Sequence, residues 1–129
     1  MPQVTGSFTV DTFDATPLDG EGGVLAHIEI TKTFTGGLTG TSTVYMTSAR
    51  TSVEDSAGYV AIERVVGVVG DLDGTFVLQH SGTSDRGVQS LTVTVVPDSG
   101  TGSLEGLRGE FTIGAESPGG HDYSFDYTL

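Results

Sequence analysis

The chain has 129 residues, of which 17 are acidic and five are basic, so its formal net charge is −12. This length fits one domain with one core, and the acidic surplus disfavours binding to nucleic acid or to an anionic membrane surface. Gly, Thr and Val make up about two fifths of the residues, a composition that favours strands and frequent turns over helices. Cysteine is absent, which excludes disulfides and thiolate chemistry.

The N-terminal segment gives no sign of export. Residues 1–6 lack the basic and apolar regions of a secretory signal. No apolar run approaches the ~20 residues that a membrane-spanning helix needs. We therefore expect a cytoplasmic protein that does not associate with membranes.

Alternation of apolar and polar residues, bounded by turn residues, recurs about eight times along the chain. It begins with Phe8 and Val10 and continues over 26–34, where Lys32 interrupts the apolar face; we expect its charged end to reach solvent. Segment 46–57 has apolar residues at helical spacing, but its Ser and Thr content favours a strand that ends near Ala49 and then a loop. Further strands are predicted at 38–47, 59–69, 75–80, 88–96, 104–115 and 123–129.

The turns between these segments are short and rich in Gly, Pro and Asp, at 36–37, 70–74, 97–100 and 118–120. Such turns cannot hold a crossover helix, so consecutive strands are expected to pair antiparallel. Closing eight strands removes both open edges and leaves room for packed side chains or one small ligand. We predict an all-β fold, a closed eight-stranded antiparallel up-and-down barrel that spans residues 1–129 as a single domain. A two-sheet sandwich is the alternative.

The segment 59–69 carries apolar side chains on both faces. A strand of this kind needs a cover on each side, one from its own core and one from elsewhere. In a chain this short, another subunit is the favoured second cover. We therefore expect a homodimer or homotrimer.

The candidate site residues are Glu63, Arg64 and His80, which lie among apolar neighbours on two consecutive predicted strands. A charge in such surroundings costs several kcal/mol unless it is paired. If the paired residue numbers sum to 144, Arg64 lies opposite His80; if they sum to 145, His80 shares a face with Glu63. A Glu and a His beside an apolar cavity would form an acid–base pair, whereas a salt bridge at the rim or an interface contact is the structural alternative. Tyr45 is a further polar candidate for the same barrel.

Metal binding has little support. His27 and Glu29 share one face of a predicted strand and His80 could join them, but the set is sparse, so surface histidines without metal are favoured. The segment 71–74 begins like a calcium loop and then departs from its pattern, so a plain turn is favoured. No metal or other cofactor is predicted.

Several segments resemble a family of small bacterial proteins classified as a domain of unknown function, over about Gly6 to Leu129. They are GTFVLQHSG at 74–82, VVPDSGTGSLEGLRG at 95–109, ERVVG at 63–67, and Tyr123 with Tyr127. The part at 100–106 is also similar to a segment of allene oxide cyclases and dirigent proteins, eight-stranded barrels that form trimers or dimers.

The resemblance implies an allene-oxide-cyclase-like barrel here. It implies no activity, because outside the Gly-Thr-Gly turn nothing matches the catalytic positions of those cyclases, and no catalytic residue is carried over. The glycines themselves have a physical interpretation: we expect a positive φ at Gly100 and Gly102, and sharp strand bends at Gly106 and Gly109.

Two functions of different class remain open. One is a barrel that binds a small apolar or amphipathic molecule. The other is a cofactor-free isomerase or cyclase, in which Glu63, His80 and Tyr45 stabilise developing charge on an apolar substrate. The composition does not separate them.

Overall fold

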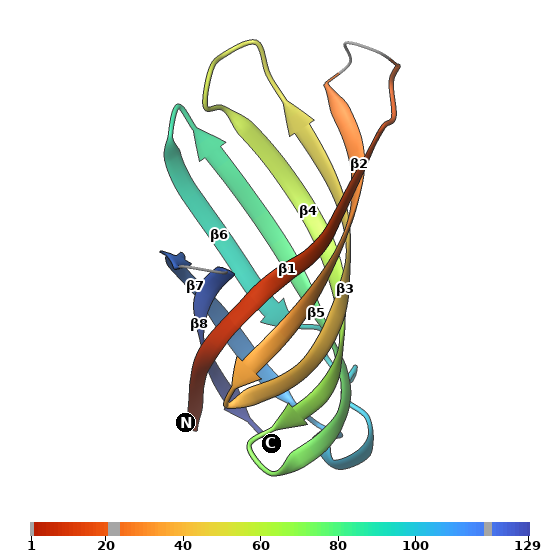
Figure 1. The fold of residues 1–129 in the computed structure, drawn as a ribbon, viewed down its shortest axis with the longest axis vertical. Coiled ribbons are helices and arrows are strands. Elements are labelled where there is room, and N and C mark those ends of the chain that lie inside the picture. Colours follow the sequence, from red (N-terminus) through yellow and green to blue (C-terminus); the bar gives the residue numbers. More distant parts are fainter. Residues whose placement is uncertain (1, 21–23, 118–119) are drawn as a thin grey trace.

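The computed structural model describes residues 2–20, 24–117 and 120–129, which form eight antiparallel strands and one short 3₁₀ turn (Figure 1). Each strand pairs with its neighbours in sequence, and β1 also pairs with β8, which closes the ring. The predicted closed eight-stranded antiparallel barrel is therefore confirmed. The elements are β1 (Gln3–Pro17), β2 (Leu25–Gly36), β3 (Leu38–Arg50), β4 (Ala57–Val69), β5 (Leu72–Asp85), β6 (Val88–Val95), η1 (Gly102–Leu104), β7 (Arg108–Ser117) and β8 (Gly120–Thr128).

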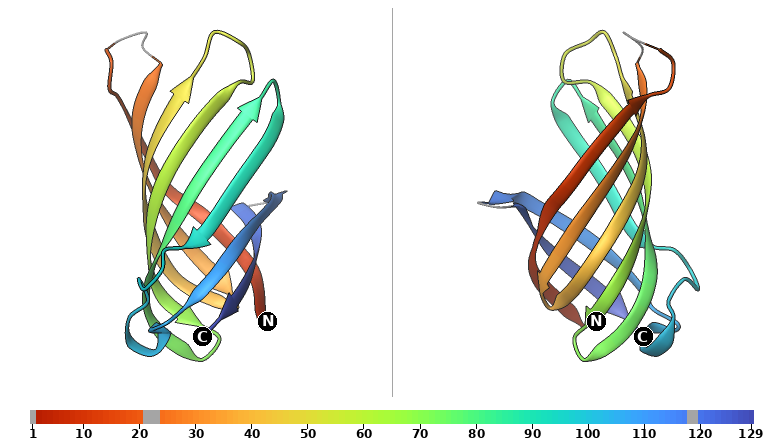
Figure 2. Two further views of the ribbon diagram at one scale, coloured as in Figure 1. Left: turned by 180° about the vertical axis from the view of Figure 1, so that it is seen from behind. Right: turned by 45° about the vertical axis from the view of Figure 1, so that its right-hand side comes forward.

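The barrel is complete at one end only. β1 pairs with β8 over Gln3–Phe8, while its remaining residues pair with β2 alone. β6 pairs with β7 only through Val93 and Thr94. Figures 1 and 2 show the consequence: β1 to β6 extend well beyond β7 and β8, so the other end of the barrel is an open, curved sheet formed by these six strands. We call these parts the closed half and the open half.

The closed half holds the main core. Phe111 and Phe125 stack with ring centroids 4.3 Å apart, and Phe34 contacts Phe111 edge-on. The phenol of Tyr123 donates a hydrogen bond to the carbonyl oxygen of Thr35 and accepts one from the backbone N–H of Leu38. These contacts pack the closed half with aromatic side chains.

The segment before β7 differs from the prediction of a strand over 104–115. Gly102–Leu104 forms the 3₁₀ turn, and β7 begins only at Arg108. Leu104 and Leu107 are fully buried, so their apolar character reflects a turn packed against the core rather than a strand. The expected positive φ is present at Gly102 and also occurs at Gly106, where a bend within a strand was predicted.

The positive φ expected at Gly100 is not present. A Cβ at this position would lie 1.9 Å from the carbonyl oxygen of Leu104, so the close approach of the backbone explains why this residue is a glycine.

The turn between β4 and β5 is tighter than the predicted 70–74. Val69 pairs with Leu72, so only Gly70 and Asp71 lie between the strands, and Gly70 has φ +62°. The residue numbers of each β4–β5 pair sum to 141, so both predicted registers, with sums of 144 and 145, are wrong. Because this sum is odd, Glu63 and His80 still share a face.

Two smaller predictions have different outcomes. β3 ends at Arg50 and a loop follows, as expected for 46–57. The turn at 118–120 lies partly outside the described residues. The described part of the chain contains no helix with the length and apolarity that crossing a membrane requires.

Candidate functional site

Four side chains from four consecutive strands meet inside the barrel. The Glu63 carboxylate on β4 is the centre: its Oε1 lies 2.7 Å from His80 Nε2 on β5 and 3.3 Å from Lys32 Nζ on β2. Its Oε2 accepts a hydrogen bond of 2.5 Å from the Ser42 hydroxyl on β3. All four residues are buried, with Glu63 only 1% exposed and His80 4% exposed. We call this set the Glu63 cluster.

The cluster keeps the carboxylate ionised. Burial alone would raise the pKa of Glu63, but the hydrogen bond from His80, the charges of Lys32 and His80 and the hydrogen bond from Ser42 together lower the pKa below its ordinary value. An ionised carboxylate can only accept hydrogen bonds. The contact with His80 therefore requires a proton on Nε2 of the ring.

The buried charge of Lys32 has fewer polar partners than that of Glu63. Within residues 2–20, 24–117 and 120–129 its ammonium pairs with Glu63, and it lies 4.4 Å from the centroid of the Phe8 ring. Glu63 has three polar partners and loses only one of them if Lys32 is removed. The lysine that interrupts the apolar face of β2 is thus held inside by its partner, and the prediction that its charged end reaches solvent is wrong.

The Glu63 cluster lies where the closed half meets the open half. On β4, Val65 belongs to the main core on one side, and Ala61 belongs to a second apolar cluster with Ile30 and Val44 on the other. The polar side chains therefore form a layer between two apolar regions. Beyond this layer the inner face of the barrel opens to solvent.

The inner face of the open half is apolar and exposed. Phe13 on β1 pairs with the buried Ile30 and so points to the same, inner side, yet it is 60% exposed. Leu91 on β6 pairs with Gly82 and is 42% exposed. These side chains lack the cover that β7 and β8 provide in the closed half.

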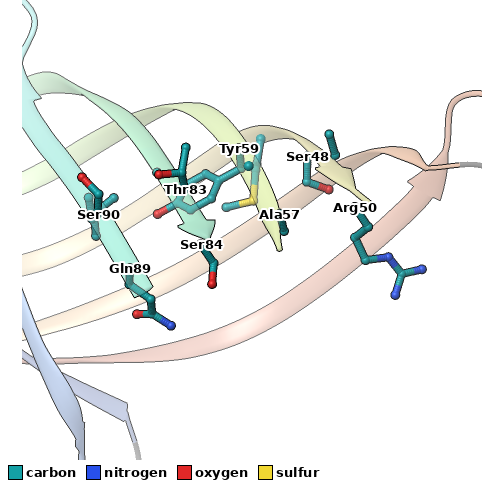
Figure 3. Close-up of a pocket in the computed structure, with 13 residues that line it drawn as sticks. Ser48, Arg50, Ala57, Tyr59, Thr83, Ser84, Gln89 and Ser90 are labelled. Carbon is teal, nitrogen blue, oxygen red and sulfur yellow. The ribbon is translucent and has the colours of Figure 1, made fainter. Parts of the chain in front are cut away.

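A cavity of about 230 Å³ lies on this inner face, over β3 to β6. Met46, Tyr59 and Leu91 form its apolar wall, and Arg50, Ser84 and Gln89 stand near its mouth. Figure 3 shows Arg50 and Gln89 projecting from the same side of the sheet, with Tyr59 between them. We call this the β3–β6 cavity.

Tyr59 lies beside both the cavity and the Glu63 cluster. Burial, followed by the negative charge of Glu63, raises the pKa of the phenol above its ordinary value. The ring packs flat on β5, since a Cβ at Gly82 would lie 2.5 Å from the ring atom Cε1. The hydroxyl makes no hydrogen bond within the described ranges, so it is a neutral donor available to a bound molecule.

The predicted site residues separate into two groups. Glu63 and His80 meet inside the barrel, as the acid–base hypothesis required. Arg64 and Tyr45 lie on the outer face: strand alternation points Arg64 away from Glu63, and Tyr45 pairs with the exposed Ile62. Neither side chain reaches the interior, so the expectation that they join an internal site is corrected.

Tyr45 instead borders an outer groove of about 450 Å³ together with Val60 and Ile62. His27 and Glu29 also face outward, because His27 and Glu29 alternate with the inward Ile28 and Ile30. They therefore lie on the opposite face of the barrel wall from His80. In the part of the chain that the structure describes, no three His, Cys, Asp or Glu side chains are grouped as a metal site would need.

Sequence reasoning missed Lys32, Ser42, Tyr59 and Arg50. For Lys32 a signal was present, since a lysine within a regular apolar stripe needs a counter-ion if the strand is buried. Tyr59 and Arg50 gave no such signal. Their positions matter only because β7 and β8 are too short to cover the open half.

The fold and site define a class: an antiparallel eight-stranded barrel with one filled half, one open apolar half and a buried ionic layer between them. The chain belongs to the DUF3224 family, described as "Protein of unknown function", whose family model matches residues 4–127. This membership agrees with the resemblance to a bacterial domain of unknown function. No match was found among curated proteins.

A solved structure of the same family is closely similar. It is the crystal structure of a protein of unknown function from the DUF3224 family of Shewanella oneidensis MR-1, at 1.84 Å resolution. The two chains are 44% identical, and the match covers 100% of this chain and 97% of that chain with a TM-score of 0.91. The barrel is therefore common to both proteins.

Proposed function

We propose that this protein binds a small apolar or amphipathic molecule in the open half of its barrel. The observation that carries the proposal is the exposed apolar inner face, with the β3–β6 cavity set into it. Soluble proteins rarely leave a concave apolar surface uncovered unless something binds there. A filled core in this half would have argued against any ligand.

The closed half provides the rigid base that such a site needs. Its aromatic core and the Glu63 cluster tie β2 to β5 together directly beneath the cavity. The cavity wall therefore consists of extended strands whose positions are set by packing below them. Sites on strands are held more rigidly than sites on loops.

The test is a titration with 1-hexanol, followed by NMR of the Met46 and Leu91 methyl groups. We expect saturable shifts with a dissociation constant in the millimolar range, because so small an apolar ligand gains little beyond the cost of association. Leu91→Asp should abolish the shift of the Met46 methyl group by placing a charge in the apolar wall. Val88→Asp is the control, because Val88 is on the same strand and alternates to its outer face.

Absence of saturable shifts in the wild-type protein would refute the proposal. Shifts that persist in Leu91→Asp would place the hexanol elsewhere. Native mass spectrometry of the freshly purified protein is a second test, since a co-purified molecule would appear as a mass above 13.3 kDa.

The relationship to allene oxide cyclases and dirigent proteins is part of the same proposal. It is supported by the eight-stranded barrel and by the similarity of the segment at 100–106. A cofactor-free isomerase or cyclase is the second candidate function, and the buried Glu63–His80 contact of 2.7 Å favours it. Both side chains are enclosed, so a substrate would have to displace the apolar side chains above them.

Exchange of α-protons distinguishes the enzyme from the binding protein. If Glu63 and His80 transfer protons, the protein should accelerate deuterium incorporation into 2-hexanone in D₂O, as followed by NMR. His80→Asn should remove the acceleration and leave binding of the ketone unchanged. Exchange no faster than in buffer would exclude proton transfer on a ketone of this size.

A further inference from the structure

The cavity has the opposite charge balance to the rest of the chain. The sequence contains 17 acidic and five basic residues, yet the described residues that line the β3–β6 cavity include Arg50 and no Asp or Glu. A protein with this composition would place carboxylates around an arbitrary surface depression. The one charged group at the cavity is therefore a cation at a site where the composition favours anions.

The guanidinium of Arg50 has no partner within the described ranges. The ion pairs there join Lys32 and His80 to Glu63, and Arg108 to Asp98. Glu54 and Asp55 follow Arg50 on the loop after β3 and border a neighbouring depression with it, but neither forms an ion pair with it. Its five N–H donors are thus available to a ligand.

The position of Arg50 places its charge at the mouth of the cavity. Met46 and Ser48 alternate with it on the inner side of β3, so successive inward residues run from the apolar wall to the guanidinium. Figure 3 shows Arg50 extending away from the sheet at one end of the cavity, beyond Ser48 and Ala57. An apolar group in the cavity would therefore have its polar end near this side chain.

We propose that the ligand of the β3–β6 cavity is an apolar molecule that carries a carboxylate, with Arg50 as the residue that binds the acid group. Arginine is suited to this role because its planar fork gives a carboxylate two parallel hydrogen bonds. The apolar part of the ligand lies against Met46, Tyr59 and Leu91. The cavity volume of about 230 Å³ limits that part to a short chain or a single ring. This inference rests on the function proposed above.

The experiment compares hexanoate with 1-hexanol, which have the same chain length and differ in the charged end. At pH 7 the wild-type protein should bind hexanoate about 10-fold more tightly than hexanol, the scale of one charge-assisted hydrogen-bonded pair (~1.4 kcal/mol). Arg50→Gln should remove this preference and leave hexanol binding unchanged. Arg64→Gln is the matched control: it removes the same charge from the outer face, so the preference should persist.

The outcomes separate the two proposals. Equal or weaker binding of hexanoate, with hexanol still binding, would overturn the carboxylate inference and leave the binding function intact. A preference that survives in Arg50→Gln would also overturn it, because another group would then be responsible. Failure of both compounds to bind would refute the binding function itself.

Discussion

Replacement of Glu63 by Gln tests the buried ionic layer directly. Gln has nearly the same shape as Glu, and its amide oxygen can still accept the hydrogen bond from Ser42, but the negative charge is lost and the amide NH2 faces Lys32 and His80. Lys32, which is 7% exposed, would then have a buried ammonium without a counter-ion, 4.4 Å from the centroid of the Phe8 ring. Removing one partner of a buried ion pair costs about 3–5 kcal/mol, because the remaining charge stays desolvated.

That cost is a large part of the ~10 kcal/mol expected for a domain of this size. It corresponds to a fall in the melting temperature of roughly 12–20 °C. The free energy of unfolding can be measured by urea titration with far-UV circular dichroism as the signal, since the chain contains no Trp for fluorescence. Lys32→Met should cost less than Glu63→Gln, because Glu63 keeps His80 and Ser42 as partners.

The double variant Lys32→Met/Glu63→Gln decides whether the charges are coupled. With the ammonium gone, the neutral Gln no longer leaves a bare charge behind. The double variant should therefore be more stable than Glu63→Gln alone, with a coupling energy of about 2 kcal/mol or more. Free energies that add within ~0.5 kcal/mol would refute the argument, since the two groups would then act independently.

Three further predictions concern the pH dependence of stability, the packing of Tyr59 and the oligomeric state. The pKa of Glu63 is lowered in the folded protein from 4.5, so the stability it contributes is present above about pH 4.5 and is lost as the pH falls through the folded pKa; Glu63→Gln should flatten this acid limb in urea titrations from pH 3 to 7. Gly82→Ala should push the Tyr59 ring into the cavity and weaken hexanol binding, whereas Gly58→Ala, whose nearest neighbour would be 3.7 Å away, should not; equal binding by both variants would contradict this packing. We expect a homodimer or homotrimer through the exposed outer face of β4; Ile62→Glu should dissociate it in light scattering, and a wild-type monomer at micromolar concentration would exclude it.

The order of the strands could be predicted because each one carries its own alternation and each turn is short. Phe8, Phe34 and Phe125 all point inward as their spacing indicated. The register between β4 and β5 was missed because it depends on the length of the turn, and Leu72 and Asp73 extend β5 instead of the loop. Turn residues indicate where a chain reverses, but the strand pairing determines how many residues the turn contains.

The candidate site was predictable only in part. Glu63 and His80 were identified because ionisable residues in apolar strands require partners. Arg64 was a candidate for the same reason, yet an adjacent residue on a strand points to the opposite face, and the outer face of β4 is itself apolar through Val60, Ile62 and Val66. Apolar flanks on both sides of a strand therefore conceal which of two neighbouring charges is buried.

The β3–β6 cavity could not be predicted from the sequence of any single strand. Phe13 and Leu91 occupy inward positions that a complete barrel would bury, and their exposure results from the ends of β7 and β8, which lie elsewhere in the chain. The strands of the open half are joined by their backbone ladders. The Glu63 cluster adds side-chain hydrogen bonds that join β2, β3, β4 and β5 at the level where the aromatic core ends. The buried charges whose loss destabilises a variant therefore join three of the four strands on which the cavity lies, directly below the cavity.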